Sequence, residues 1–294
     1  MFQWLLIMCL NSMALLTLIP ATHILAEDSA RRLTNNEAHD YHCKWSPDGT
    51  SIAFTSWRTG EAKLFVIPAS GGEATLIESG LSGDHHIGWS PDSKYLVFDA
   101  NAPGDRPPRL WLVPVECGDV RPLVPEVVPA WQPALSPDGE WVVFATFRGG
   151  RSDVWKAKLN GDSLTQITDD PATDHHPQWS PDGNSIIFTS DRGGNWDVWM
   201  TNSDGAGGTR QITTFPESDD HAMFSPSGKL IAFMSEHSGK RDIWVIPVDG
   251  GPAGQVTHDG ENSWPSFSPD SKYLVWSSNR DGQLDLYIGK IADD

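Results

Sequence analysis

The sequence has 294 residues and a formal net charge of −18, from 39 acidic and 21 basic side chains. A chain this acidic repels nucleic acid and anionic lipid surfaces, and neither is expected as a partner. Its charge favours cations and basic partners instead. No Gly-x-Ser-x-Gly motif is present, and a repeat occupies nearly the whole chain. An appended serine hydrolase domain is therefore excluded.

The first 26 residues contain no Asp, Glu, Lys or Arg. They form an apolar stretch of signal-peptide length that ends in the small residue Ala26 before Glu27. We predict a secretory signal over residues 1–26 and a single domain over residues 27–294, in a periplasmic or secreted protein with no membrane span after cleavage. The alternative is a retained membrane anchor, although the uninterrupted apolar length falls short of a comfortable span.

A turn motif of the type Trp-Ser-Pro-Asp-Gly occurs six times along the chain. Its serines are separated by 44, 46, 44, 45 and 43 residues. A near-constant period of this length indicates an array of supersecondary units, and four short strands per period are typical of a propeller blade. The sequence therefore predicts an all-β, six-bladed β-propeller. The copies begin at Trp45, Trp89, Leu135, Trp179, Phe224 and Phe267.

Each unit contains the same succession of predicted strands. One strand approaches the turn, a β-branched and aromatic strand leaves it, and a third follows a Gly-rich hairpin, as at Ser185–Phe188 and Val198–Trp199 in the fourth unit. A short outer strand comes next, as at Gln166–Thr168. The sixth unit ends with its third strand, whereas Arg31–Thr34 resembles an outer strand that precedes the first unit. We therefore predict that Arg31–Thr34 completes the sixth blade and closes the ring.

One repeat position is rich in histidine. The first strand of each blade lines the central axis of a propeller, so equivalent side chains converge there. Neutral imidazoles around an open position suit a transition metal such as Zn or Mn, and nearby carboxylates complete the ligand shell or orient the rings. Four residues before each motif serine stand His42, His86, Gln132, His176, His221 and Trp264; six residues before stand Asp40, Asp84, Ala130, Asp174, Asp219 and Asn262.

These positions predict metal ligands at His42, His86, Gln132, His176 and His221, and binding groups at the channel mouth at Asp40, Asp84, Asp174 and Asp219. Two neighbouring histidines, His85 and His175, are expected to face an adjoining blade or solvent. The alternative is purely structural: the histidines hydrogen-bond across the channel mouth, and the aspartates pair with Arg58, Arg148, Arg192 and Arg280.

The repeat resembles that of the TolB propeller family. The resemblance is carried by the turn Trp179–Gly183, the segment Phe188–Arg192 and the aspartate-led segment Asp197–Trp199. It implies a six-bladed propeller that binds a protein or peptide partner in the periplasm. The same repeat is similar to that of oligogalacturonate lyases, which hold a channel metal with His and Gln side chains. That likeness implies the same role for the five candidate ligands, with an acidic oligosaccharide as the ligand class.

Two functions follow. The first is an exported TolB-like binding or scaffold module without catalytic activity, and no catalytic residue is assigned. The second is a metal-dependent enzyme or carbohydrate binder with one transition metal ion in the channel. Tight stoichiometric metal separates the two hypotheses.

Overall fold

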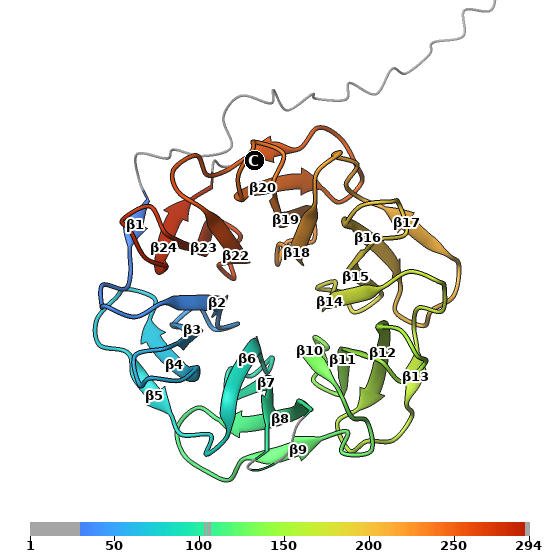
Figure 1. The fold of residues 1–294 in the computed structure, drawn as a ribbon, viewed down its shortest axis with the longest axis horizontal. Coiled ribbons are helices and arrows are strands. Elements are labelled where there is room, and N and C mark those ends of the chain that lie inside the picture. Colours follow the sequence, from blue (N-terminus) through green and yellow to red (C-terminus); the bar gives the residue numbers. More distant parts are fainter. Residues whose placement is uncertain (1–29, 103, 105–106, 292–294) are drawn as a thin grey trace, which may run out of the picture.

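The computed structural model describes residues 30–102, 104 and 107–291. These residues contain no helix and form six four-stranded antiparallel sheets arranged around a central axis (Figure 1). The predicted six-bladed β-propeller is therefore confirmed. The proposed signal over residues 1–26 lies outside the described residues, and no membrane-spanning helix is found within them.

Each blade runs from an inner strand at the axis to a short outer strand at the rim (Figure 1). The strands in blade order are β2 (Asp40–Trp45), β3 (Ser51–Ser56), β4 (Lys63–Pro68) and β5 (Thr75–Ile77); β6 (Ser82–Trp89), β7 (Tyr95–Asn101), β8 (Arg109–Pro114) and β9 (Arg121–Leu123); β10 (Trp131–Leu135), β11 (Trp141–Thr146), β12 (Asp153–Lys158) and β13 (Thr165–Gln166); β14 (Asp174–Trp179), β15 (Ser185–Ser190), β16 (Asp197–Asn202) and β17 (Thr209–Gln211); β18 (Asp219–Phe224), β19 (Leu230–Ser235), β20 (Asp242–Pro247) and β21 (Gly254–Gln255); and β22 (Asn262–Phe267), β23 (Tyr273–Ser278), β24 (Asp285–Lys290) and β1 (Arg31–Arg32).

The Ser-Pro-Asp turn fixes the hairpin between the first two strands of a blade. In blade four, the Ser180 hydroxyl donates to Asp182 Oδ1 at 2.6 Å and accepts the backbone N–H of Ser185 at 2.9 Å. Gly183 adopts φ 73°, a conformation in which glycine carries no Cβ penalty. The turn therefore sets the register that brings the inner strand to the axis.

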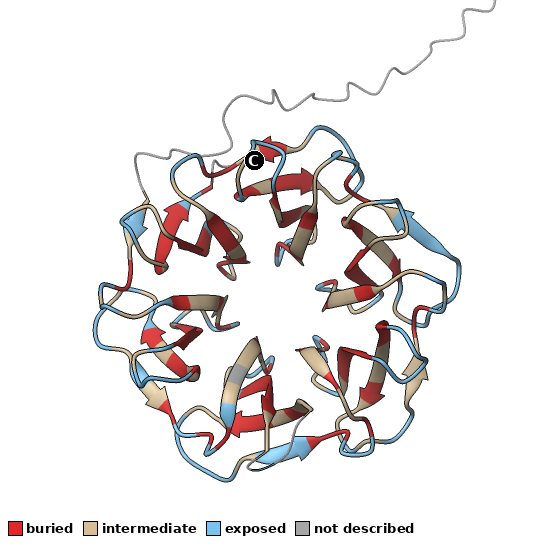
Figure 2. Ribbon diagram, in the orientation of Figure 1, coloured by how far each residue is buried: buried red, intermediate tan, exposed pale blue. Residues whose placement is uncertain are grey.

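The core lies between neighbouring blades. The second strand of every blade is almost entirely buried (Figure 2). Hydrophobic clusters combine side chains of adjacent blades, such as Val97 of blade two with Phe144 of blade three. Burying one such aromatic side chain contributes about 2 kcal/mol. One fully buried aromatic residue occupies the same place in each blade: Phe54, Phe98, Phe144, Phe188, Phe233 and Trp276.

The two ends of the described chain close the ring as predicted. β1 pairs antiparallel with β24, with Arg31 opposite Ile288. The Thr34 hydroxyl accepts the backbone N–H of Leu286 at 3.0 Å. Thr168, Thr213 and Thr257 make the same bond to the third strands of blades three to five, at 3.0, 2.9 and 2.9 Å. The outer strands therefore end before these threonines, because a side chain replaces the next backbone carbonyl.

We expect Arg32→Met to destabilise this closure by about 2 kcal/mol, because it leaves a buried carboxylate without its cation. Arg32 binds Asp285, whose side chain is fully buried and also accepts the Thr34 hydroxyl at 3.2 Å. Urea unfolding measures the loss. The control is Arg31→Met, since Arg31 is exposed and contacts only backbone carbonyls, at 3.2 and 3.3 Å. Equal stability of the two variants would contradict the closure role of Arg32.

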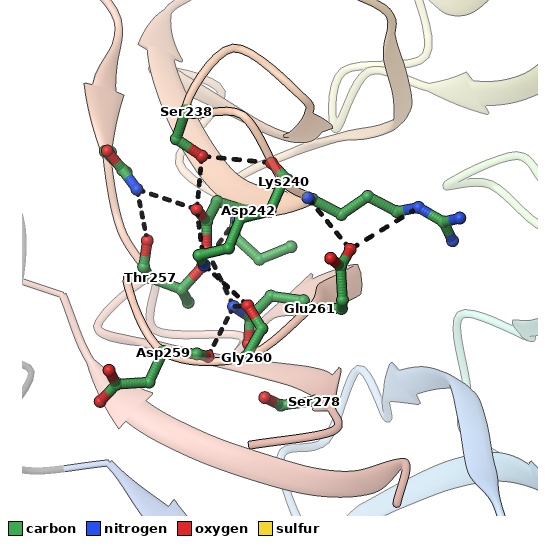
Figure 3. A network of polar contacts seen from close by, with 12 residues as sticks. Ser238, Lys240, Asp242, Thr257, Asp259, Gly260, Glu261 and Ser278 are labelled. Carbon is green, nitrogen blue, oxygen red and sulfur yellow. Dashed lines mark hydrogen bonds and ion pairs between the residues drawn. The ribbon is translucent and has the colours of Figure 1, made fainter. Parts of the chain in front are cut away.

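A buried polar network joins blade five to blade six (Figure 3). Both carboxylate oxygens of Asp242 bind Lys240, at 2.7 and 2.9 Å, and one of them accepts the Asn262 amide at 2.9 Å. Lys240 also donates to the carbonyl of Gly260 at 2.7 Å. Because each oxygen of this buried aspartate has several donors, its burial is compensated.

Candidate functional site in the central channel

The histidine-rich repeat position lies at a β-bulge of every inner strand. The pairing register shifts there in all six blades, for example between His175 and Gln178. A bulge re-aims a side chain relative to a regular strand. All six residues have positive φ: His42 53°, His86 43°, Gln132 56°, His176 50°, His221 53° and Trp264 55°. Gln132 and Trp264 share this conformation, so the bulge belongs to the fold and does not require histidine. The four histidines at this position are therefore an additional feature of this sequence.

The six bulge residues line one cavity on the propeller axis, which we call the histidine cavity. It has about 460 Å³ of empty volume, part of it open to solvent. Neighbouring rings lie close together, with centroids 4.6 Å apart for His42 and His86 and 3.9 Å apart for His176 and His221. The structure therefore brings His42, His86, Gln132, His176 and His221 together.

Two of the rings are oriented by carboxylates. His86 Nδ1 lies 2.8 Å from Asp99 Oδ1, and His176 Nδ1 lies 2.7 Å from Asp220 Oδ1. A carboxylate only accepts hydrogen bonds, so Nδ1 is the donor in each ring and Nε2 is the atom that the neutral ring would offer to a ligand. Carboxylate-bound imidazoles of this kind are typical of metal-ligating histidines.

Asp220 is the centre of a second, tighter group. His175 Nδ1 lies 2.9 Å from His176 Nδ1, and ligand atoms of His175, His176 and Asp220 all lie within 4.8 Å of one another. Burial alone would raise the pKa of Asp220, but His176 and His221 beside it hold that pKa well below its usual range. His175 was expected to face a neighbouring blade or solvent. It packs against His176 and Trp196 of its own blade, with ring centroids 4.6 and 4.5 Å away, and also faces Asp220 of the neighbouring blade five.

The remaining two histidines have an unused nitrogen. Nδ1 of His42 and Nδ1 of His221 are buried and make no hydrogen bond, although His221 Nδ1 lies 3.3 Å from Asp220 Oδ2. Burial is the main reason that the pKa values of both rings lie well below the usual histidine value of 6.5. Both rings are therefore neutral at pH 7 and each has a lone pair available to a metal ion.

The donor set fits a transition metal ion. Imidazole nitrogens are good ligands for Zn, and oxygen donors such as the Gln132 carbonyl suit Mn. The carboxylates of Asp99 and Asp220 supply orientation and compensating charge. Gln132 fits less directly, because its Oε1 already accepts the backbone N–H of His176 at 2.8 Å and only its second lone pair remains. Trp264 closes the ring of bulge residues without offering a ligand atom.

The predicted aspartate positions lie apart from the histidine cavity. Asp40 and Asp174 are fully buried, and each binds an arginine with both oxygens: Arg58 at 3.1 and 3.0 Å and Arg192 at 2.9 and 2.8 Å. These pairs are the structural alternative that the sequence left open. Asp219 is also fully buried, but it has no arginine partner among the described residues, and only the hydroxyls of Ser235 and Thr213 lie beside it, without a hydrogen bond of normal geometry. The side chain of Asp84 lies outside the described part of the chain.

Three polar residues of the site escaped sequence reasoning. Asp99 and Asp220 lie outside the two repeat columns that carry the pattern, and only their contacts with histidine reveal them. Lys44 lies two residues beyond His42 and lines the same cavity. Burial lowers its pKa to about 8. Its repeat equivalents are Gly88, Ala134, Gln178, Met223 and Ser266, so no shared residue type marked the position.

The fold and the site define a six-bladed propeller with a histidine-lined axial cavity. Residues 87–288 match the family model described as the TolB beta propeller domain, and the chain belongs to that family. A curated relative, an uncharacterised protein of Agrobacterium fabrum, is 30% identical over 133 residues, which are 45% of this chain and 44% of the relative. The match thus spans less than half of that relative's length.

Solved structures share the fold. A TolB candidate from Agrobacterium tumefaciens superposes with a TM-score of 0.74 at 21% identity, covering 90% of this chain and 94% of the other. TolB from Acinetobacter baumannii gives 0.63 at 22% identity, covering 86% of this chain and 64% of that one. An oligogalacturonate lyase in complex with manganese gives 0.62 at 16% identity, covering 92% and 95%. At these identities the likeness shows the fold alone.

Proposed function

We propose that this chain is an exported TolB-like binding module whose ligand site is the histidine cavity, and that this site binds one divalent transition metal ion. The observation that carries the proposal is the convergence of four imidazoles on one cavity. His86 and His176 have carboxylate-bound Nδ1 atoms, whereas the buried Nδ1 atoms of His42 and His221 make no hydrogen bond. Buried nitrogen lone pairs without a donor are costly unless a ligand uses them.

The residues that would hold the ion are His42, His86, His176 and His221, with the second lone pair of Gln132 Oε1. When bound, the metal would supply a Lewis-acidic position that attracts an anionic ligand. Asp99 and Asp220 orient their histidines through Nδ1. The oligogalacturonate lyase of the same fold was solved with manganese, which supports Mn beside Zn as the ion to test first.

Elemental analysis of the purified protein after dialysis without chelator tests the proposal. We expect about one Mn or Zn per chain, and restoration of that stoichiometry when the stripped protein is reloaded. A ligand that binds only the folded state raises its stability, so the reloaded protein should also unfold at higher temperature. Absence of metal, with no shift in melting temperature when Mn or Zn is added, would overturn the metal site.

The same face carries the second candidate function, the binding of a protein or peptide partner. The observation that favours it is a hollow beside the histidine cavity, shared by blades five and six and lined by Trp264 and by both charge signs, including Glu217, Lys240 and Arg241. Aromatic residues and arginine are enriched at protein interfaces, and the rim around them is polar. Export to the periplasm or beyond belongs to this proposal as well and follows from the character of residues 1–26.

A further inference from the structure

We propose that the histidine cavity contains an anion site, centred on Lys44, that binds a small carboxylate. The inference goes beyond the proposed metal site and does not require the metal. Lys44 and Gln178 are the two residues that line both the histidine cavity and the adjoining cavity on the same axis, which is bordered by Trp45, Trp89 and Phe267. They therefore lie where the two cavities meet.

Lys44 has no counter-ion among the residues that the structure describes. Its ammonium takes part in no ion pair or side-chain hydrogen bond there, whereas Arg58 and Arg192 bind the buried carboxylates of Asp40 and Asp174. An ammonium withdrawn from bulk water without a partner is unfavourable. Within the described residues, Lys44 is thus an unpaired cation that lines the axial cavity.

Neutral donors accompany this cation. The indole Nε1–H of Trp264 is buried without a hydrogen-bond partner, and Trp264 lines the same cavity. The side-chain amide of Gln178 makes no hydrogen bond with the described residues. Ammonium and indole groups can only donate hydrogen bonds, so the complementary ligand must accept them.

The charge count selects the ligand class. One ammonium with neutral amide and indole donors balances a single negative charge, as a carboxylate carries. A phosphate dianion would leave one charge uncompensated near the Asp99 and Asp220 carboxylates, which bind two histidines of this cavity. The two oxygens of a carboxylate can accept from Lys44 and from a neutral donor at once.

Titration with lactate, with lactamide as its uncharged match, tests the inference in protein that has been stripped of metal with EDTA and then dialysed free of EDTA, which is itself a carboxylate. The readout is the indole N–H resonance of Trp264, assigned with Trp264→Phe. We expect lactate to shift it saturably and lactamide to leave it unchanged. Lys44→Met should weaken lactate binding at least about tenfold, because a charge-assisted hydrogen bond is lost. Lys44→Arg should keep binding, and the exposed Lys94→Met should match the unchanged protein.

Equal shifts with lactate and lactamide, or unaltered binding in folded Lys44→Met, would overturn the anion site. Tighter binding of inorganic phosphate than of lactate would overturn the assignment to carboxylates. The lactate titration uses protein without metal, so it is independent of the metal site. Saturable lactate binding in a protein that takes up no Mn or Zn would overturn the metal site and leave the anion site standing. Metal uptake without lactate binding would sink the anion site alone.

Discussion

Replacing both His176 and His221 with alanine abolishes stoichiometric metal binding. These rings lie 3.9 Å apart by their centroids and share Asp220, which contacts His176 Nδ1 at 2.7 Å and His221 Nδ1 at 3.3 Å. Removing them takes two of the four imidazoles and leaves Asp220 without a ring to orient. We expect the metal content after dialysis to fall from about one per chain to background, measured by elemental analysis.

The matched control for this variant is the double replacement of His237 and His258, which are exposed and do not line the histidine cavity. This control should retain the metal. Asp220→Asn should keep the ligands but weaken metal binding about 10- to 100-fold, as loss of an orienting carboxylate does. Full metal content in the folded His176/His221 variant would place the ion elsewhere.

His175 separates two arrangements of the site. In one, the ion is held across the cavity by Nε2 of His176 and the other bulge histidines, and His175 is dispensable. In the other, the ion lies between His175, His176 and Asp220, whose ligand atoms are within 4.8 Å of one another. Metal retained by His175→Ala supports the first arrangement, which is the one proposed, and metal lost from that variant supports the second.

Asp219→Asn stabilises the protein at pH 8 and has little effect near pH 4. Burial raises the pKa of Asp219 from 3.8 to about 7. A carboxyl with a higher pKa in the folded state favours folding most below its unfolded pKa, and this contribution is lost as the pH rises toward the folded pKa. The stability of the unchanged protein should therefore fall, relative to that of the variant, between about pH 4 and pH 7.

The gain at pH 8 should be a few kcal/mol, since one pKa unit corresponds to about 1.4 kcal/mol. Urea unfolding across the pH range measures it. Asp174→Asn is the control: the same position in blade four is paired with Arg192 at 2.9 and 2.8 Å, so this change should cost about 3 kcal/mol at pH 8. If the difference in unfolding free energy between Asp219→Asn and the unchanged protein did not vary with pH, the claim that Asp219 carries an uncompensated buried charge would be wrong.

Asp219 lacks the arginine partner of Asp40 and Asp174 because of the residue that stands 18 positions after each aspartate. Arg58 and Arg192 stand there in blades one and four, and each lies over aromatic rings, such as Phe54 and Phe188 at 5.2 and 5.0 Å. Blade five has His237, which binds Glu217 at 2.8 Å and stacks on Phe215. Blade five therefore has no arginine to neutralise Asp219, as Arg58 and Arg192 neutralise the equivalent aspartates of blades one and four.

Sequence alone determined the architecture and the members of the histidine column. Copies of Trp-Ser-Pro-Asp-Gly at a near-constant spacing predict equivalent blades. In a propeller, equivalent positions such as His42 and His176 lie around one axis, whatever the details of their packing. The outer strand at Arg31 was predictable for the same reason, because a ring with five complete blades and one incomplete blade leaves an unpaired edge.

Tertiary structure alone decided which polar groups act on that column. Asp99 and Asp220 orient histidines, Lys44 stays unpaired, and Asp40 and Asp174 are neutralised by arginine whereas Asp219 is not. Periodicity specifies which positions are equivalent, but ion pairs and hydrogen bonds depend on which individual side chains lie within about 3 Å of each other. That choice is made by the individual side chains of each blade and by their contacts with the next blade, which repeat symmetry does not encode.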